Sequence, residues 1–289
     1  MQILTQILED VRQNLARSQA GLPLEELQKR LPDLPTTKSL SQTLKDDGFG
    51  LIAEIKACSP SMGTMRAENV AEAPEAYDQS SAVRAFSILT NQTFFGQDLA
   101  YLQNLRGKTN KPILRKDFII DPYQIYEARV AGADAILLMA NILSAEEMKD
   151  LYELARALGL EALCEVHTPE EISLLPEHPA LVGINARKFK SEDSAETFAR
   201  SRTQEGQTQK EDFTIHFEAF SLYPQLPAKA LKIAESGMNP DNLSPVLRQY
   251  PFNAALVGTS LLQSPHGVRH ELQAFEKAIS KLAKSTAME

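Results

Sequence analysis

Charged and amide side chains stand at the ends of short apolar segments in this sequence, where buried strands would end. They are Glu54, Lys56, Lys116, Glu165, Asn185, Arg187 and Glu235. Glu54 and Lys56 are two residues apart, so on a strand they would point to the same side. Burial there would lower a lysine pKa and nearby carboxylates would raise it again, and a lysine balanced in this way can act as a general acid. The set predicts proton-transfer chemistry, although a purely structural cluster of ion pairs would use the same residue types.

Small residues at two later segment ends predict a site for an anion. Ser236 and Gly237 lie in one turn, and Gly258 and Thr259 lie in the other. Backbone N–H groups in such turns are free to point at a phosphate, and a short helix predicted over 259–262 would direct its positive end toward it. A single glycine after a strand makes an ordinary tight turn, so the prediction depends on both turns together.

The His and Cys residues give no support for metal or disulfide chemistry. His167 has no second His or Cys at a metal-ligand spacing, so we expect it in an accessory or surface position. Cys58 and Cys164 are too few for a disulfide framework, so we expect free thiols, with Cys58 small and buried. The sequence therefore predicts no metal site.

The segment 113–143 has the pattern of a strand, a helix and a second strand. Asp121 and Pro122 suit the N-cap and the first position of a helix, and Gly132 suits the residue after its end. The apolar run that follows is typical of a strand buried on both faces, as in a parallel sheet. Lys116 then lies at the carboxyl end of the first strand, the edge where α/β folds place ligand chemistry.

Short apolar segments alternate with helical spacers along the chain, which is typical of a parallel sheet with helices outside it. The eight segments are residues 51–56, 85–89, 113–115, 135–139, 162–166, 181–185, 231–235 and 254–258. Eight strands favour closure into a (β/α)8 barrel. A doubly wound open sheet is the alternative, but Gly48 and Gly50 precede a strand, so they do not form a dinucleotide-binding loop.

We expect a single domain over residues 1–289, with residues 1–49 as an N-terminal helical extension. Residues 188–212 are polar and charged and contain few large apolar side chains, which predicts a mobile loop after the sixth strand. Such a loop could be a lid over a barrel mouth or a passive insertion.

The composition argues against several classes of partner. A net charge of −8 is unfavourable for binding nucleic acid, whose phosphates attract a basic face. The sequence has no apolar run long enough to cross a membrane, and its first residues lack the basic and continuous apolar regions of a secretory signal. We therefore expect a cytoplasmic protein with neither a membrane nor a nucleic-acid partner.

The motifs, taken in order, resemble the indole-3-glycerol-phosphate synthase family from the N-terminal helix to about Pro265. The segments that carry the resemblance are residues 52–56, 59–61, 87–90, 94–96, 114–143, 165–167, 183–187, 234–237 and 256–261. The resemblance implies a (β/α)8 barrel with an extra N-terminal helix. It also implies a carboxy-lyase of tryptophan biosynthesis, whose phosphorylated substrate is an anthranilate joined to an open-chain ribulose 5-phosphate. Ring closure, decarboxylation and dehydration of this substrate give indole-3-glycerol phosphate.

The resemblance further implies a role for each site residue. Lys116 would protonate the ketone oxygen as the aromatic ring carbon attacks, and Glu165 would be the acid/base partner in the dehydration. Glu54 and Asn185 would orient the reacting groups, and Lys56 would lie near the substrate carboxylate. The implied substrate-binding residues are Arg187, Phe118, Glu235, Ser59, Ser236, Gly237, Gly258 and Thr259. No metal or organic cofactor is implied, and we expect a monomer or a weak homodimer.

Two alternatives use the same barrel. A phosphoribosylanthranilate isomerase-like enzyme would need a thiol and an aspartate as acid and base, which Lys116 and Glu165 do not provide. An inactive paralogue could keep the phosphate site and act as a binding or scaffold protein. The intact set of Glu54, Lys56, Lys116 and Glu165 argues against loss of activity.

Overall fold

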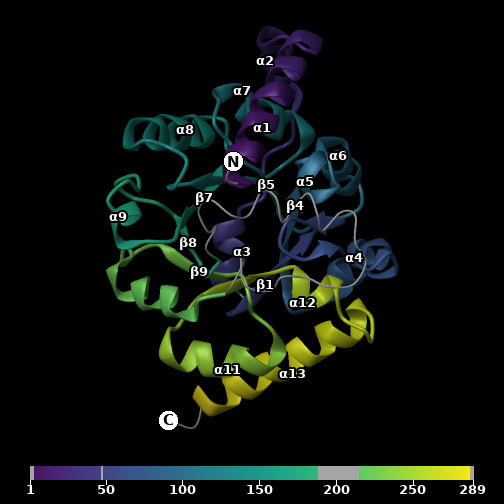
Figure 1. The fold of residues 1–289 in the computed structure, drawn as a ribbon, viewed down its shortest axis with the longest axis vertical. Coiled ribbons are helices and arrows are strands. Elements are labelled where there is room, and N and C mark those ends of the chain that lie inside the picture. The colour runs from purple at the N-terminus through teal and green to yellow at the C-terminus, as the bar shows by residue number, and fades with distance from the viewer. Residues whose placement is uncertain (1–2, 47, 188–214, 287–289) are drawn as a thin grey trace.

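The computed structural model describes residues 3–46, 48–187 and 215–286, and the predicted loop at 188–212 lies outside these ranges (Figure 1). Within them, eight parallel strands close into a barrel in the order β1-β10-β9-β8-β7-β6-β5-β4. The strands are β1 (Gly50–Ile55), β4 (Val83–Leu89), β5 (Ile113–Lys116), β6 (Ala135–Met139), β7 (Glu161–Val166), β8 (Leu181–Asn185), β9 (Leu231–Glu235) and β10 (Ala254–Val257). The predicted closed barrel is confirmed, and the open-sheet alternative is wrong.

Helices surround the strands as an outer ring (Figure 1). They are α4 (Ala67–Gln79), α5 (Gln92–Phe95), α6 (Leu99–Arg106), α7 (Pro122–Ala131), α8 (Ala145–Ala157), α9 (Pro169–Ile172), the 3-10 segment η2 (Phe217–Gln225), α11 (Pro240–Gln249), α12 (Thr259–Leu262) and α13 (Val268–Thr286). The predicted boundaries of α7 are confirmed. Asp121 forms a capping box, Pro122 is the first helical residue, and Gly132 has a φ of 88°. Among the described helices, none is long and apolar enough to span a bilayer.

Alternation along the strands divides the apolar core into two clusters. On β1, Leu51 and Ile55 pack outward against the helices, whereas Ile52 belongs to the cluster that includes the barrel interior. Because successive strand residues face opposite sides, Glu54 shares the inner side with Ile52. The same alternation places the charged strand ends inside the barrel at its carboxyl-terminal mouth.

Some boundaries differ from the prediction. Lys56 follows β1 instead of ending it, and Lys116 is the last residue of β5 because it pairs with Leu89 of β4. Strand β10 ends at Val257, so Gly258 is the N-cap residue of α12. A short hairpin between β1 and α4, formed by β2 (Cys58–Ser59) and β3 (Gly63–Thr64), was not predicted.

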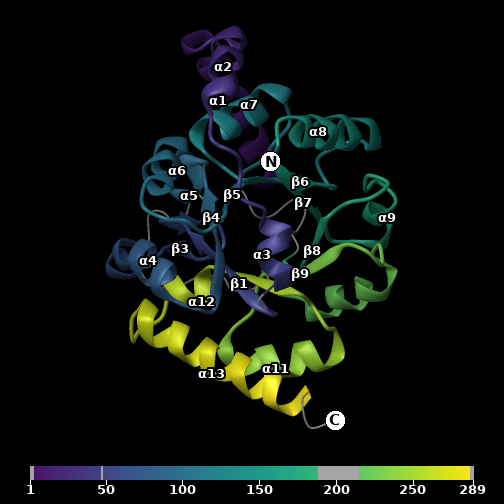
Figure 2. The ribbon, with the colours of Figure 1, turned by 180° about the vertical axis from the view of Figure 1, so that it is seen from behind.

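The elements before the barrel are α1 (Ile3–Gly21), α2 (Leu24–Arg30), the 3-10 turn η1 (Leu31–Asp33) and α3 (Leu40–Asp46). Helix α3 covers the amino-terminal end of the barrel (Figure 2), where Ser39 and Ser41 donate hydrogen bonds to Glu161 at the start of β7. Leu40 and Leu44 of this helix join the interior apolar cluster. This end of the barrel is therefore filled by side chains.

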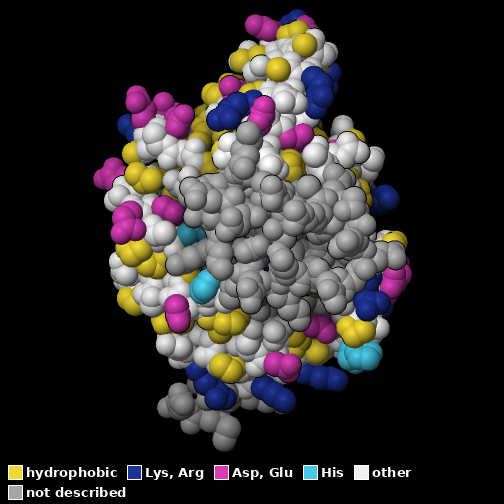
Figure 3. All heavy atoms as spheres, viewed as in Figure 1, with side chains coloured by type: hydrophobic (Ala, Val, Ile, Leu, Met, Phe, Trp, Pro, Cys, Tyr) yellow, Lys and Arg dark blue, Asp and Glu magenta, His cyan; other side chains and the backbone are white. Residues whose placement is uncertain are grey.

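Helix α1 runs alongside α7, and its first turns reach the other end of the barrel (Figure 1). Its buried residues Ile3, Ile7 and Val11 share an apolar cluster with Phe95 and Phe118. In the same view, Figure 3 shows acidic and basic side chains on the surface of the described residues.

Candidate active site

A cavity of about 350 Å³ opens at the carboxyl-terminal ends of the strands, and it is large enough for a small ligand. All the site residues predicted from the sequence line it. They are Glu54, Lys56, Ser59, Lys116, Phe118, Glu165, Asn185, Arg187, Glu235, Ser236, Gly237, Gly258 and Thr259. The structure therefore brings together residues that are up to 205 positions apart (259 − 54) in the sequence.

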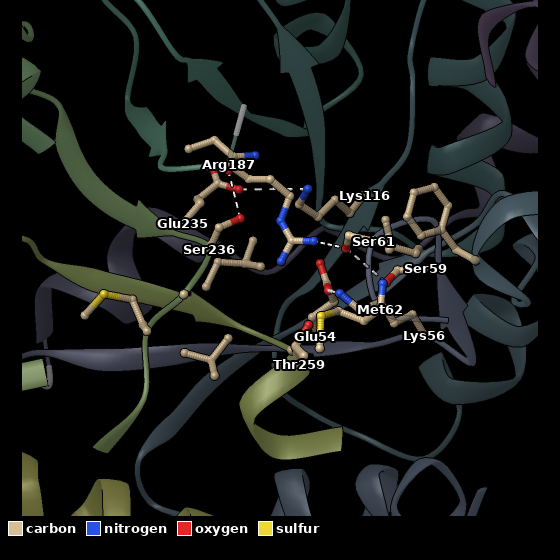
Figure 4. A pocket seen from close by; sticks show the side chains of 18 of the residues that line it. Glu54, Lys56, Ser59, Ser61, Met62, Lys116, Arg187, Glu235, Ser236 and Thr259 are labelled. Carbon is tan, nitrogen blue, oxygen red and sulfur yellow. Dashed lines mark hydrogen bonds and ion pairs between the residues drawn. The ribbon is translucent and has the colours of Figure 1, made fainter. Parts of the chain in front are cut away.

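Lys116 lies within 4 Å of two buried carboxyl groups, of which Figure 4 labels Glu235. Its Nζ lies 3.6 Å from Oε2 of Glu165 and 3.9 Å from Oε2 of Glu235. Burial opposes the charge on Lys116, but Glu165, Glu235 and Glu54 together raise its pKa above the usual lysine value. Lys116 therefore carries its proton at neutral pH, as a general acid must.

Glu165 and Glu235 hold their protons differently. Burial favours the neutral form of Glu165, but the positive charges of Lys116 and His167 outweigh it and lower the pKa of Glu165. Burial and the charge of Glu165 raise the pKa of Glu235 well above its usual range. A pair of buried carboxyl groups with pKa values pushed apart provides one base and one acid. Within this pair the surroundings therefore favour Glu165 as the carboxylate and Glu235 as the protonated acid.

Glu54 and Lys56 form a buried ion pair across the cavity from these groups (Figure 4). Nζ of Lys56 lies 2.5 Å from Oε1 of Glu54. Burial raises the pKa of Glu54, but the positive charges of Lys56 and Lys116 outweigh burial and lower this pKa below its usual value. The group therefore stays ionised. For Lys56 burial is the larger effect, and its pKa is lowered despite the contact with Glu54. Burial and neighbouring carboxylates thus oppose each other at both lysines, as predicted, and the net effect lowers the pKa of Lys56 and raises the pKa of Lys116.

Arg187 and Asn185 connect the end of β8 to its neighbours. The Arg187 guanidinium donates a hydrogen bond to Ser61 Oγ in the loop between β2 and β3 (Figure 4). Oδ1 of Asn185 accepts hydrogen bonds from the Arg187 backbone N–H at 3.0 Å and from Ser236 Oγ at 2.8 Å. Asn185 therefore ties the loop after β8 to the loop after β9.

The predicted anion site contains a strained turn. Ser236 has a φ of 69° and Gly237 has a φ of 76°, and Ser236 is the one non-glycine residue with a positive φ among the described residues. A turn of this kind can present backbone N–H groups to an anion. Thr259 opens α12 across the cavity from this turn (Figure 4). The geometry agrees with an anion site at this end of the cavity.

Two glycines leave room for the cavity carboxylates. A Cβ at Gly258 would overlap Oε1 of Glu54, and a Cβ at Gly183 would overlap Oε1 of Glu235. The sequence indicated Gly258 as part of the anion site, and the structure shows that it also accommodates Glu54. Phe118 and Phe95 form an aromatic wall of the cavity. Their rings are stacked, with centroids 6.3 Å apart and an interplanar angle of 27°.

Sequence reasoning missed or misplaced several residues. We expected His167 in an accessory or a surface position; it is only 8% exposed, so the surface position is wrong. Its Nε2 lies 3.4 Å from Oε1 of Glu165. The spacing of two residues between them was the available signal, since both point the same way from the end of β7. Ser61 was missed as the partner of Arg187. Neither Cys58 nor Cys164 forms a disulfide, as expected, but Cys58 is only half-buried and does not line the cavity.

The sequence matches the family model described as indole-3-glycerol phosphate synthase over residues 4–197, more than half of the chain. The chain belongs to this family. The indole-3-glycerol phosphate synthase of Bacteroides thetaiotaomicron is 34% identical over 277 residues, covering 96% of this chain and 98% of that protein. The Rhodopirellula baltica protein of the same name is 37% identical over 268 residues, covering 92% and 95%. These matches confirm the resemblance inferred from the motifs.

Solved structures of other barrels share the fold of this family member. The N-(5'-phosphoribosyl)anthranilate isomerase of Pyrococcus furiosus aligns with 78% of the chain at a TM-score of 0.50 and 12% identity. The thiamine phosphate pyrophosphorylase of the same organism aligns with 84% of the chain at a TM-score of 0.53 and 13% identity. At these identities the likeness concerns the fold alone.

Proposed function

We propose that this chain is an indole-3-glycerol-phosphate synthase, a carboxy-lyase of tryptophan biosynthesis. It converts 1-(2-carboxyphenylamino)-1-deoxyribulose 5-phosphate to indole-3-glycerol phosphate, CO₂ and water. Family membership supports the activity. The placement of Lys116 between Glu165 and Glu235 is the observation that carries the mechanism.

The reaction requires proton transfers at fixed positions. The ketone oxygen leaves as water, so it must receive two protons, and the carbon beside the nitrogen must lose one. Lys116 gives the first proton to the ketone oxygen as the ring carbon that carries the carboxylate attacks the ketone carbon. CO₂ then departs and the aromatic ring is restored. In the dehydration Glu165 takes the proton from the carbon beside the nitrogen, since its lowered pKa keeps it ionised as a base. The protonated Glu165 then gives a proton to the departing hydroxyl group.

The remaining residues position the substrate. We propose that the phosphate binds the turn at Ser236 and Gly237 together with Gly258, Thr259 and Ser59. Lys56 and Arg187 would lie near the substrate carboxylate, and Phe118 would contact the aromatic ring. Glu54 and Asn185 would orient the reacting groups, and Glu235 would bind sugar hydroxyls or the neighbouring lysines. All these side chains line the cavity.

The isomerase-like alternative is not favoured. It would need a thiol in the cavity, and Cys58 does not line it, while Cys164 is fully buried with its pKa raised by burial to about 12. A cytoplasmic location and a monomer or weak homodimer remain our proposals from the sequence.

The test is to incubate the purified protein with the carboxyphenylamino-deoxyribulose phosphate and follow indole fluorescence. Release of CO₂ in equal amount is measured in parallel. Appearance of both products supports the synthase. Binding of the substrate without either product would support the inactive paralogue and overturn the proposal.

A further inference from the structure

A buried histidine lies directly behind Glu165. His167 follows β7 and points to the same side as Glu165, with its Nε2 3.4 Å from Oε1 of that carboxylate. Its Nε2 atom is buried and has no hydrogen-bond partner in the described part of the chain. His167 does not line the cavity, so a substrate that fills the cavity leaves it in place. It is therefore positioned to act on Glu165 and not on the substrate.

Glu171 of α9 fixes the orientation of this histidine. Oε2 of Glu171 accepts a hydrogen bond from the His167 backbone N–H at 2.7 Å and lies 3.2 Å from the ring Nδ1. Because a carboxylate only accepts, Nδ1 is the protonated nitrogen of this contact, and Nε2 is directed at Glu165. A carboxylate that orients an imidazole in this way also favours its charged form.

The two oxygens of Glu165 face different partners. Oε1 is nearest to His167, whereas Oε2 is nearest to Lys116 at 3.6 Å. Glu235 is buried beside Glu165, and its Oε2 lies 3.9 Å from Nζ of Lys116, whereas no ion pair joins it to His167 among the described residues. Lys116 approaches both carboxyl groups almost equally, so it does little to decide which of them is ionised. His167 lies near one of them only.

Resting on the proposed function, we propose that His167, oriented by Glu171, is a positioning residue that keeps the negative charge of the Glu165–Glu235 pair on Glu165. Glu165 is then the carboxylate that acts as the base in each dehydration. The neutral partner Glu235 keeps its proton. Without His167 the two buried carboxyl groups would compete for one proton on nearly equal terms.

The charges around His167 agree with this role. Burial opposes its charge, but the hydrogen bond with Glu171 and the charges of Glu165 and Glu171 raise the pKa of His167, against a smaller opposing effect of Lys116. The positive charge of His167 follows that of Lys116 among the causes that lower the pKa of Glu165. Among the described residues, the other charged groups that face His167 and Glu165 are Lys116 of β5, Glu171 of α9 and Glu235 of β9.

The experiment compares pH profiles of kcat for the full-length enzyme and the His167→Gln variant. Loss of the positive neighbour raises the pKa of Glu165, so the acidic limb should move to higher pH by about one unit. On the acidic limb kcat at a fixed pH should therefore fall by up to about tenfold, while the plateau value of kcat and KM change little, since His167 does not line the cavity. The Glu171→Gln variant keeps an acceptor for the ring but removes its charge, and should shift the limb in the same direction by a smaller amount.

Two controls separate the possible failures. Glu170 is exposed on the same helix, so Glu170→Gln should leave the profile unchanged. Ring ¹⁵N NMR should show that His167 stays charged to higher pH in the wild type than in Glu171→Gln, which tests the contact without turnover. Active wild type with an unshifted acidic limb in His167→Gln would overturn this inference alone. Absence of turnover in the wild type would instead contradict the proposed function.

Discussion

Gly183 on β8 leaves the space that the carboxylate of Glu235 on β9 occupies. The two strands are adjacent, and a Cβ at position 183 would lie 1.9 Å from Oε1 of Glu235, far inside van der Waals contact. Glu235 is 1% exposed and lines the cavity, so any displacement of its carboxyl group changes the site itself. The shape of the barrel interior at this glycine therefore determines where one of the two carboxyl groups beside Lys116 can lie.

Substitution of Gly183 by alanine should displace Glu235 and disturb its contact with Lys116. We expect kcat to fall by about tenfold or more, because small displacements of catalytic groups are costly. Steady-state kinetics and circular dichroism measure activity and folding. Gly107→Ala is the matched control, since a Cβ there meets only Asn104 O at 3.8 Å and the residue is exposed. Equal activity of both variants would show that the position of Glu235 is unimportant.

Replacement of Lys116 by alanine removes the proposed general acid. Turnover should fall by about two orders of magnitude or more, the usual scale for such a loss. The barrel should remain folded, because Lys116 is the last residue of β5 and its truncation leaves the apolar clusters of the core intact. Near-normal kcat in a variant with a wild-type circular dichroism spectrum would remove Lys116 from this role.

The sequence predicted the residues of the site better than their interactions. Strand ends and the alternation of β1 were enough to place Glu54 inside the barrel, because closure brings all inner strand ends together. The contact between Arg187 and Ser61 depends on a hairpin that the sequence pattern did not indicate. His167 was misjudged because its partner Glu171 is set by how α9 folds back on β7. The direction of each lysine pKa depends on how many carboxylates surround it, which requires coordinates.

Replacement of Glu235 by glutamine should stabilise the protein increasingly as pH rises. The folded-state pKa of Glu235 is raised above its unfolded value, so its contribution to stability is present at low pH and is lost as pH rises through the folded-state pKa. Glutamine cannot ionise and avoids this loss. The difference in unfolding free energy between variant and wild type should therefore grow above about pH 4.5, by up to about 1.4 kcal/mol per pH unit.

Urea unfolding at about pH 5 and about pH 8 tests this expectation. Glu177 is exposed, so Glu177→Gln is a control for removing a carboxylate without burial. A Glu235→Gln variant that is less stable than the wild type at the higher pH would show that Glu235 is ionised in the folded protein.

Asp10 connects helix α1 to the residues that follow β4. Its carboxylate accepts hydrogen bonds from Asn91 Nδ2 at 2.9 Å and Thr93 Oγ1 at 2.8 Å, next to the helix that carries Phe95. Asp10→Ala leaves those donors without this acceptor, so we expect a loss of about 1–2 kcal/mol in unfolding free energy. Because Phe95 stacks on Phe118 in the cavity wall, KM should rise more than kcat falls. The exposed neighbour Glu9 supplies the control Glu9→Ala, and equal KM values for the two variants would separate α1 docking from substrate binding.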